Sequence, residues 1–200
     1  MSISKPFAPA CERNQQPIAE VLKHVFQAVN HVLEIGSGTG QHAVYFAQEM
    51  PWLHWQPSDI EDNIAGIQAW VDDAGLPNLL SPLVLDVNDD HWPENRFDAL
   101  FTANSLHIMS WESVKNFMQN AAQRLDLNGY LATYGPFNYG GNYTSASNAQ
   151  FDQWLKQQSD HSAIRNIEDL AELAARHALD LCEDYDMPAN NRLLLWKKTS

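Results

Sequence analysis

A glycine-rich turn after a short apolar strand constrains the fold of this chain more than any other feature. The run V-L-E-I at 32–35 leads directly into G-S-G-T-G at 36–40, and helical residues follow from Phe46. Glycines at such a turn let the backbone approach a ligand closely, because they carry no Cβ. A strand, a glycine turn and a helix in this order are typical of the nucleotide-binding corner of a doubly wound α/β fold.

Three details of the turn indicate which nucleotide it binds. The dinucleotide fingerprint G-x-G-x-x-G/A needs Gly or Ala at position 41, where this chain has Gln41. Glu34 places a negative charge beside the turn, which opposes a pyrophosphate and suits a cationic ligand. The formal net charge of −13 disfavours polyanionic partners in general. S-adenosylmethionine fits all three details, because it has an adenosine, a sulfonium and an ammonium group but no phosphate.

The pattern E-x-G-x-G-x-G in this turn resembles the first motif of class I S-adenosylmethionine-dependent methyltransferases. The resemblance implies the cofactor S-adenosyl-L-methionine and the product S-adenosyl-L-homocysteine. It also implies that the motif binds the cofactor, and the residues we assign to that role are Glu34, Gly36, Ser37, Gly38 and Gly40.

An acidic residue ends the second apolar strand. Asp59 lies 19 residues after Gly40, and a carboxylate about 20 residues beyond a glycine turn is placed to accept hydrogen bonds from both ribose hydroxyls. The alternative is that Asp59 caps the following helix, although a carboxylate at a strand end can serve both purposes. Glu61 follows two residues later, so either acid could hold the ribose.

The adenine is expected beside Ile60 and at the end of the third strand. Asp86 follows the apolar run 83–85, where the resembled class holds the adenine amino group, and Val87 would offer a backbone amide to the ring. The alternative for Asp86 is an ordinary turn residue.

The fourth expected strand, 97–103, leads into the segment N-S-L-H at 104–107. Ligands collect outside the carboxyl ends of strands in open α/β sheets, so we expect Asn104 and Leu106 to contact the cofactor. His107 is a candidate general base, with packing beside the cofactor or capping of the next helix as the alternative. No pair of histidines has metal-ligand spacing, so no metal is expected.

Two segments are expected to close the site. Arg13 lies ahead of the first expected helix and would meet the cofactor carboxylate, while Asn14 would contact the cofactor or cap that helix. The loop at 134–143 would present Tyr139 and Tyr143 to an acceptor, and the glycines at 140 and 141 could hinge a lid. An ordinary surface loop is the alternative.

Alternation of apolar strands with amphipathic helices predicts a mostly parallel sheet with right-handed crossovers. The expected fold class is α/β: a doubly wound, Rossmann-like, seven-stranded sheet with helices on both faces and a C-terminal antiparallel hairpin. The expected strands are 31–35, 53–58, 83–85, 97–103, 130–134, 179–185 and 192–198. The expected helices are 17–29, 41–50, 64–74, 111–125, 148–159 and 167–178.

Length and composition favour one domain over 1–200, with 1–30 as a lid segment and helix and 136–178 as the substrate-side loop and helices. No run approaches ~20 apolar residues, so no membrane span is expected. The amino terminus lacks an apolar signal core, and two distant cysteines suit a reducing compartment, so we expect a cytoplasmic location.

The chain has no cluster of Lys and Arg, which argues against nucleic acid as a partner and favours a small-molecule acceptor. Nothing in the sequence indicates an oligomeric state.

Further motifs resemble one family of small methyltransferase-like proteins, long described as a domain of unknown function. They are E-R-N-x-x-P-I, L-E-I-G-S-G-T-G-Q-H, W-x-P-S-D, N-x-x-H-I and G-P-F, and they run from residue 12 to residue 137. The resemblance implies an S-adenosylmethionine enzyme, but the family brings no established acceptor with it. The implied reaction is in-line displacement at the methyl carbon, in which a base is needed only if the nucleophile starts protonated.

Two other classes of function stay open at this point. The first is a domain that binds S-adenosylmethionine without catalysis, in a regulatory or scaffolding role. The second is a nicotinamide-dependent oxidoreductase, which Gln41 and Glu34 both disfavour.

Overall fold

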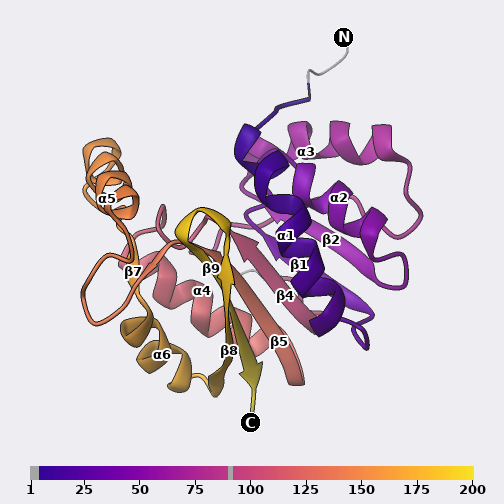
Figure 1. Ribbon diagram of the computed structural model, residues 1–200. Coiled ribbons are helices and arrows are strands. Elements are labelled where there is room, and N and C mark those ends of the chain that lie inside the picture. Colours follow the sequence, from indigo (N-terminus) through magenta and orange to yellow (C-terminus); the bar gives the residue numbers. More distant parts are fainter. Residues whose placement is uncertain (1–4, 90–91) are drawn as a thin grey trace.

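A seven-stranded sheet in the order β3-β2-β1-β4-β5-β9-β8 forms the centre of the protein. The computed structural model, shown in Figure 1, describes residues 5–89 and 92–200. Strands β1 to β5 run parallel, and β9 pairs antiparallel with both β5 and β8. The strands are β1 His31–Ile35, β2 His54–Asp59, β3 Leu83–Val84, β4 Phe97–Ala103, β5 Leu125–Gly135, β8 Leu179–Met187 and β9 Asn191–Lys198. The expected fold class is confirmed.

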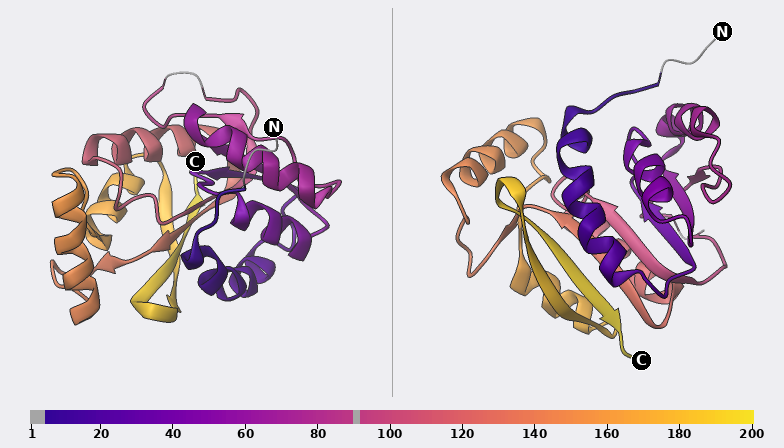
Figure 2. Two further views of the ribbon diagram at one scale, coloured as in Figure 1. Left: turned by 90° about the horizontal axis from the view of Figure 1, so that it is seen from above. Right: turned by 45° about the vertical axis from the view of Figure 1, so that its right-hand side comes forward.

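Helices cover both faces of this sheet (Figures 1 and 2). Helices α1, α2 and α3 pack on one face and α4 and α6 on the other, because each face has its own cluster of buried apolar side chains. Helix α5 stands beyond these layers (Figure 1). The bounds are α1 Pro9–Val25, α2 Gln41–Glu49, α3 Glu61–Ala74, α4 Trp111–Arg124, α5 Ala146–Gln158 and α6 Ile167–Ala175.

The first helix begins eight residues earlier than expected. Pro9, not Pro17, occupies the first turn of α1, and Pro17 lies inside the helix. Proline has no amide hydrogen, so the carbonyl of Arg13, four residues before Pro17, receives no helical hydrogen bond. Arg13 is exposed, which leaves that carbonyl near solvent. The expectation that Arg13 precedes the helix is therefore wrong.

The third strand is also shorter than expected. β3 consists of two residues at the edge of the sheet, and Val84 is 54% exposed. Leu85, just after the strand, is buried in the core, and the partly buried Leu83 packs against the same cluster. The other differences are small: β5 begins directly after α4, and α6 ends at Ala175.

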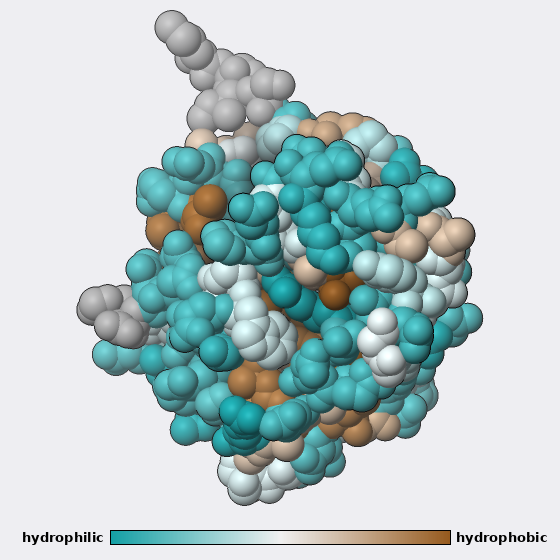
Figure 3. All heavy atoms as spheres, turned by 90° about the vertical axis from the view of Figure 1, so that its left-hand side faces the viewer, coloured by the Kyte–Doolittle hydropathy of each residue, from teal (hydrophilic) through white to brown (hydrophobic). Residues whose placement is uncertain are grey.

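A second, two-stranded sheet lies between the carboxyl end of β5 and the start of α6. β6 (Phe137–Asn138) pairs in parallel with β7 (Arg165–Asn166). This pairing returns the chain from α5 to the edge of the main sheet, near the loop that follows β4. No helix within the described ranges is long and apolar enough to cross a membrane. Figure 3 shows the side that carries α5 and α6, where hydrophilic residues cover most of the surface.

Candidate cofactor-binding site

A cleft of about 600 Å³ opens at the carboxyl ends of the parallel strands. Its walls come from the start of α1, the glycine turn after β1, the end of β2 and the loops after β3 and β4. The lining includes eight residues assigned to the cofactor from the sequence: Gly36, Ser37, Gly38, Asp59, Ile60, Asp86, Val87 and Asn104. Five others, Arg13, Asn14, Glu34, Gly40 and Leu106, are not part of the lining.

The glycine turn adopts a shape that only glycine accommodates well. Gly36, Gly38 and Gly40 have φ values of 74°, 57° and 87°, in the left-handed region. A Cβ on Gly40 would lie 3.1 Å from the backbone of Ile67 in α3, so this glycine allows close packing of the helix. A Cβ on Gly38 would meet no atom within 4 Å. Gly38 therefore presents bare backbone to the cleft.

Asp59 joins the glycine turn to the end of β2. One carboxylate oxygen accepts a hydrogen bond from the amide of Gly38 at 2.6 Å, and the other accepts from the amide of Ile60 and the side chain of Asn63 at 2.8 and 2.9 Å. A carboxylate has about four acceptor positions, so one is left for a ligand. Ile60, not Asp59, is the N-cap residue of α3, and no side chain caps that helix. Of the two acids considered for the ribose, Asp59 lines the cleft and Glu61 does not.

The floor of the cleft beside Asp59 is apolar. Ile60 is 45% exposed although it is large and apolar, and the apolar Leu85 and Val87 are also part of the lining. Asp86 folds its own loop, because its carboxylate accepts from the amide and the side chain of Asn88 at 2.9 and 3.0 Å. Asp86 therefore stabilises a turn, which was the alternative to a cofactor contact. It also lines the cleft.

Asn104 closes the end of β4 in a left-handed conformation, with φ of 58°. Its amide donates to the carbonyl of Tyr134 at 2.8 Å, which fixes the loop against β5. Residues other than glycine occupy this region at a cost of about 1–3 kcal/mol and do so often at functional sites. The neighbouring Ser105 stands 2.8 Å from where a Cβ on Gly36 would lie, so the two loops touch across the cleft floor.

Glu34 faces away from the cleft. Its side chain is 1% exposed and accepts a hydrogen bond from Trp55 Nε1 at 2.9 Å, on the side of the sheet that α2 covers. Burial raises the pKa of Glu34 to about 7, against the hydrogen bonds that lower it. The sequence suggested a negative charge beside the ligand. Instead, Glu34 is partly protonated near neutral pH, and its side chain lies on the face of the sheet that α2 covers.

Asn14 and His42 form a pair that the sequence did not predict. Asn14 lies inside α1 rather than at its start, and its side chain bonds to His42 Nε2 at 2.7 Å. His42 lines the cleft, and burial lowers its pKa to about 4. Both side chains are buried, so the pair joins α1 to α2 beside the glycine turn. The only sequence signal was the polar dipeptide Q-H directly after the turn.

Several other lining residues carried no sequence signal of their own. The start of α1 contributes Ala8, Ala10 and Cys11, and the loop after β4 contributes Ser105, Ile108 and Met109. Gly40 lies beneath the turn against α3, and Leu106 points into the apolar core under α4. Arg13 is exposed on α1.

The three candidate catalytic residues lie outside the cleft lining. His107 is 5% exposed, packs edge-on against Phe151 at 5.3 Å between ring centroids, and has a pKa that burial lowers to about 4. Because of this low pKa, His107 is neutral at neutral pH and is a weak base. The hydroxyl of Tyr143 donates to Asp152 at 2.7 Å.

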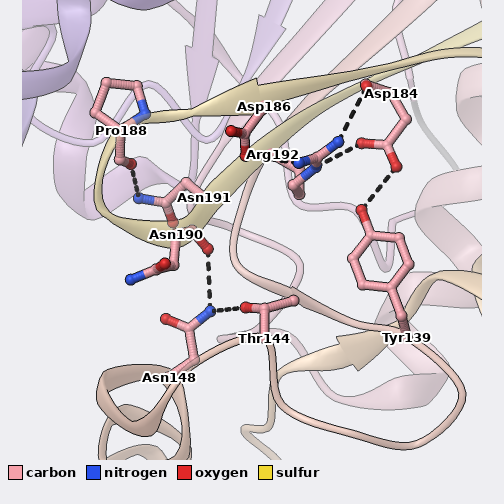
Figure 4. A network of polar contacts seen from close by, with 9 residues as sticks. All are labelled: Tyr139, Thr144, Asn148, Asp184, Asp186, Pro188, Asn190, Asn191 and Arg192. Carbon is pink, nitrogen blue, oxygen red and sulfur yellow. Dashed lines mark hydrogen bonds and ion pairs between the residues drawn. The ribbon is translucent and has the colours of Figure 1, made fainter.

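Tyr139 is held by the C-terminal hairpin (Figure 4). Its hydroxyl donates to Asp184 at 2.7 Å, and Arg192 donates to the other oxygen of the same carboxylate at 2.7 Å. Burial and this carboxylate raise the pKa of Tyr139. In the same network, Asn148 at the start of α5 donates to Thr144 and to the carbonyl of Asn190 at the hairpin tip. The segment 139–148 is thus bonded to the hairpin at two places.

A larger cleft, of about 730 Å³, lies at the opposite edge of the sheet, beside the amino ends of β1, β2 and β4. Ligands of open parallel sheets bind outside the carboxyl ends of the strands, where the glycine turn lies. The smaller cleft is therefore the candidate site. Within the described ranges no group of three His, Cys, Asp or Glu side chains could hold a metal ion.

Comparison with known proteins identifies the family and the fold of this chain. Residues 5–198 match the protein family described as "Protein of unknown function (DUF938)". The chain belongs to that family. The resemblance to a methyltransferase-like family of unknown function is thereby confirmed.

The fold of this DUF938 protein is that of S-adenosylmethionine-dependent methyltransferases. An O-methyltransferase family protein from Burkholderia thailandensis matches with a TM-score of 0.82 and 16% identity, over 93% of this chain and 56% of the other. The S-adenosylmethionine-dependent methyltransferase SibL matches with a TM-score of 0.80 and 18% identity, over 95% and 56%. The neocarzinostatin O-methyltransferase NcsB1, solved with S-adenosylmethionine and a naphthoic acid, matches with a TM-score of 0.79 and 16% identity, over 94% and 54%. The DUF938 chain thus spans about half the length of these proteins.

Proposed function

We propose that this protein is an S-adenosylmethionine-dependent methyltransferase that acts on a small-molecule acceptor and releases S-adenosylhomocysteine. The observation that carries the proposal is the joint placement of Gly38, Asp59 and Ile60 at one end of the cleft. Bare backbone, a carboxylate with a free acceptor position and an exposed apolar side chain are what an adenosine needs. The solved proteins of the same fold that are described with this cofactor or its product support the assignment.

The described residues suit the parts of this cofactor. Asp59 would accept a hydrogen bond from one ribose hydroxyl at its free position while it keeps the amide of Gly38 in place. Ile60 and Val87 would contact the adenine ring, and Asp86 would lie close to the adenine amino group. Asn104 and Ser105 would border the methionine arm, at the end of β4 where methyl transfer is expected.

The cofactor supplies a methyl group on a sulfonium, which is a good leaving group. The chain would then contribute orientation and exclusion of water, since near-attack placement can lower a barrier by ~7–11 kcal/mol. The neutral His107 and the two tyrosines, whose hydroxyls donate to carboxylates, are poorly suited to remove a proton. We therefore propose an acceptor whose nucleophilic atom is already deprotonated, or has a low pKa, at neutral pH.

The alternative is a domain that binds the cofactor without transferring its methyl group. The three residues predicted to be catalytic, His107, Tyr139 and Tyr143, lie outside the cleft lining, which favours this alternative more than the sequence did. Binding alone does not separate the two functions, whereas product formation does.

One experiment tests the proposal in two steps. Calorimetry with S-adenosylhomocysteine should show binding at about micromolar Kd, near −8 kcal/mol, and a reduced nicotinamide dinucleotide should give no signal under the same conditions. A screen of small-molecule acceptors, including phenols and carboxylic acids, should then release S-adenosylhomocysteine from S-adenosylmethionine. Binding without release across the panel would favour the non-catalytic function, and failure to bind would reject both.

A further inference from the structure

The loop that follows β4 is held from behind by one short segment. Four consecutive carbonyls, of residues 106 to 109, each accept a hydrogen bond from residues 162 to 165. The donors are the amide of Ala163, to His107 at 3.0 Å, the hydroxyl of Ser162, to Ile108 at 3.0 Å, and the guanidinium of Arg165. The front of the same loop forms the cleft wall through Ser105, Ile108 and Met109.

Arg165 binds two of these four carbonyls. Its Nε donates to the carbonyl of Leu106 at 3.1 Å, and its Nη2 donates to the carbonyls of Met109 and of His161. No carboxylate forms an ion pair with Arg165 in the part of the chain that the structure describes. The planar fork of a guanidinium can span two carbonyls three residues apart, whereas the ammonium of a lysine is a single point. Charge-assisted bonds of this kind are stronger than neutral ones.

The segment that carries Arg165 is itself fixed. The backbone of Arg165 pairs with Phe137 in the two-stranded sheet, and Phe137 is buried. The amide of Ile164 donates to Asp152 at 2.7 Å, and the same carboxylate accepts from Tyr143 and Lys156. The guanidinium also lies over the ring of Trp111, 5.8 Å from its centroid, at the start of α4. Arg165 therefore connects β6, β7 and α5 to the loop that forms the cleft wall.

We infer that Arg165 is a positioning residue for the cofactor cleft: it sets the shape of the loop 105–109 that borders the bound cofactor, without touching it. The inference rests on the proposed function. Tyr143 then acts indirectly: its hydroxyl bonds to Asp152, and the same carboxylate holds the amide of Ile164, next to Arg165. Loss of the guanidinium would leave two carbonyls of the loop without a donor and loosen the wall.

The test compares Arg165→Met and Arg165→Lys with the wild type. Calorimetry with S-adenosylhomocysteine should give a Kd raised about tenfold in Arg165→Met and less in Arg165→Lys, with stoichiometry near one in both. A residue that only stabilised the fold would lower the stoichiometry and leave the Kd unchanged. Arg96→Met is the matched control, because Arg96 donates to the carbonyl of Leu125 at 3.0 Å away from this cleft. It should leave the Kd unchanged.

Hydrogen exchange on the unliganded proteins provides the second readout. The amides of Ile108 and Met109 both donate to Ser105, so their exchange reports on the loop. They should exchange faster in Arg165→Met than in the wild type and in Arg96→Met. If Arg165→Met is not folded, Arg165→Lys and Ser162→Ala replace it, each expected to give a smaller change in the same direction. A wild-type Kd in every folded variant, or unchanged exchange, overturns the inference. Absence of binding in the wild type would instead reject the proposed function.

Discussion

The side-chain oxygen of Gln41 accepts hydrogen bonds from the amide of Ala8 at 2.6 Å and from the hydroxyl of Thr39 at 3.0 Å. Gln41 is the residue that breaks the dinucleotide fingerprint, and it joins the N-terminal segment to the glycine turn. The same segment is bonded to α3, because Trp70 Nε1 donates to the carbonyl of Pro6 at 2.8 Å and Lys5 pairs with Asp73 at 2.5 Å. Ala8, Ala10 and Cys11 of this segment line the cleft, whereas residues 1–4 of the expected lid lie outside the described ranges.

Removal of this acceptor should loosen the N-terminal segment. Gln41→Met keeps the length of the side chain and loses both bonds, at a cost of about 1 kcal/mol for each net hydrogen bond. Hydrogen exchange over residues 5–11 should rise, and the affinity for S-adenosylhomocysteine should fall. Gln41→Glu is the control: it keeps an acceptor oxygen at the N-terminus of α2, where negative charge is favourable. Equal exchange in the two variants would show that the bonds to Gln41 do not order the segment.

Asp59→Ala should weaken the binding of S-adenosylhomocysteine by about 1.5–3 kcal/mol, the usual range for hydrogen bonds to a charged group. Calorimetry measures this loss directly. The substitution also leaves the amides of Gly38 and Ile60 without their acceptor, so the free energy of unfolding should be measured alongside. Glu61→Gln changes the acid that does not line the cleft and should bind as the wild type does. A comparable loss in Glu61→Gln would mean that both acids hold the ribose.

Three buried groups predict how the free energy of unfolding changes between pH 4.5 and 5.5. His42 and His107 have pKa values near 4, below those of an unfolded chain, so in this range the unfolded state binds more protons at both. Glu34 has a pKa near 7, above its unfolded value, so the folded state binds one proton more. The net difference of about one proton means that the free energy of unfolding rises with pH by about 1.4 kcal/mol per unit from these groups.

Glu34→Gln should make this pH dependence steeper. Glutamine keeps an acceptor for Trp55 Nε1 and removes the opposing titration, so the slope should rise to about 2.3 kcal/mol per pH unit. Urea unfolding at pH 4.5 and pH 5.5 measures it. An unchanged slope in Glu34→Gln would show that Glu34 is ionised in the folded protein.

Local patterns predicted the sheet and the residues at strand ends, because both depend on short stretches of sequence. β4 was predicted to the residue. The cleft residues on those strand ends followed from the same patterns. Contacts between distant segments were missed: Asn14 with His42, and Arg165 with carbonyls 56 and 59 residues away. No periodicity marks such pairs.

The side on which Glu34 lies was also beyond the motif. Its neighbours in β1 face α4 and α6, and the alternation of side chains along a strand turns Glu34 to the other face. The glycine pattern alone states only that an acid precedes the turn. Burial and the bond to Trp55 then decide its charge, and neither can be read from the spacing.

Substitution of His107 distinguishes a catalytic role of this residue from a structural one. A general base contributes about 10²–10⁴ in rate, whereas a buried neutral imidazole packed on Phe151 contributes mainly to stability. We expect His107→Leu to lower the free energy of unfolding by about 1–3 kcal/mol and to reduce turnover at saturating cofactor by less than tenfold, once an acceptor is known. Phe151→Leu, on the other side of the same contact, should cost a similar amount of stability. A loss of turnover above a hundredfold in His107→Leu alone, with unchanged affinity for S-adenosylhomocysteine, would instead make His107 the base, and its low pKa would then be raised on acceptor binding.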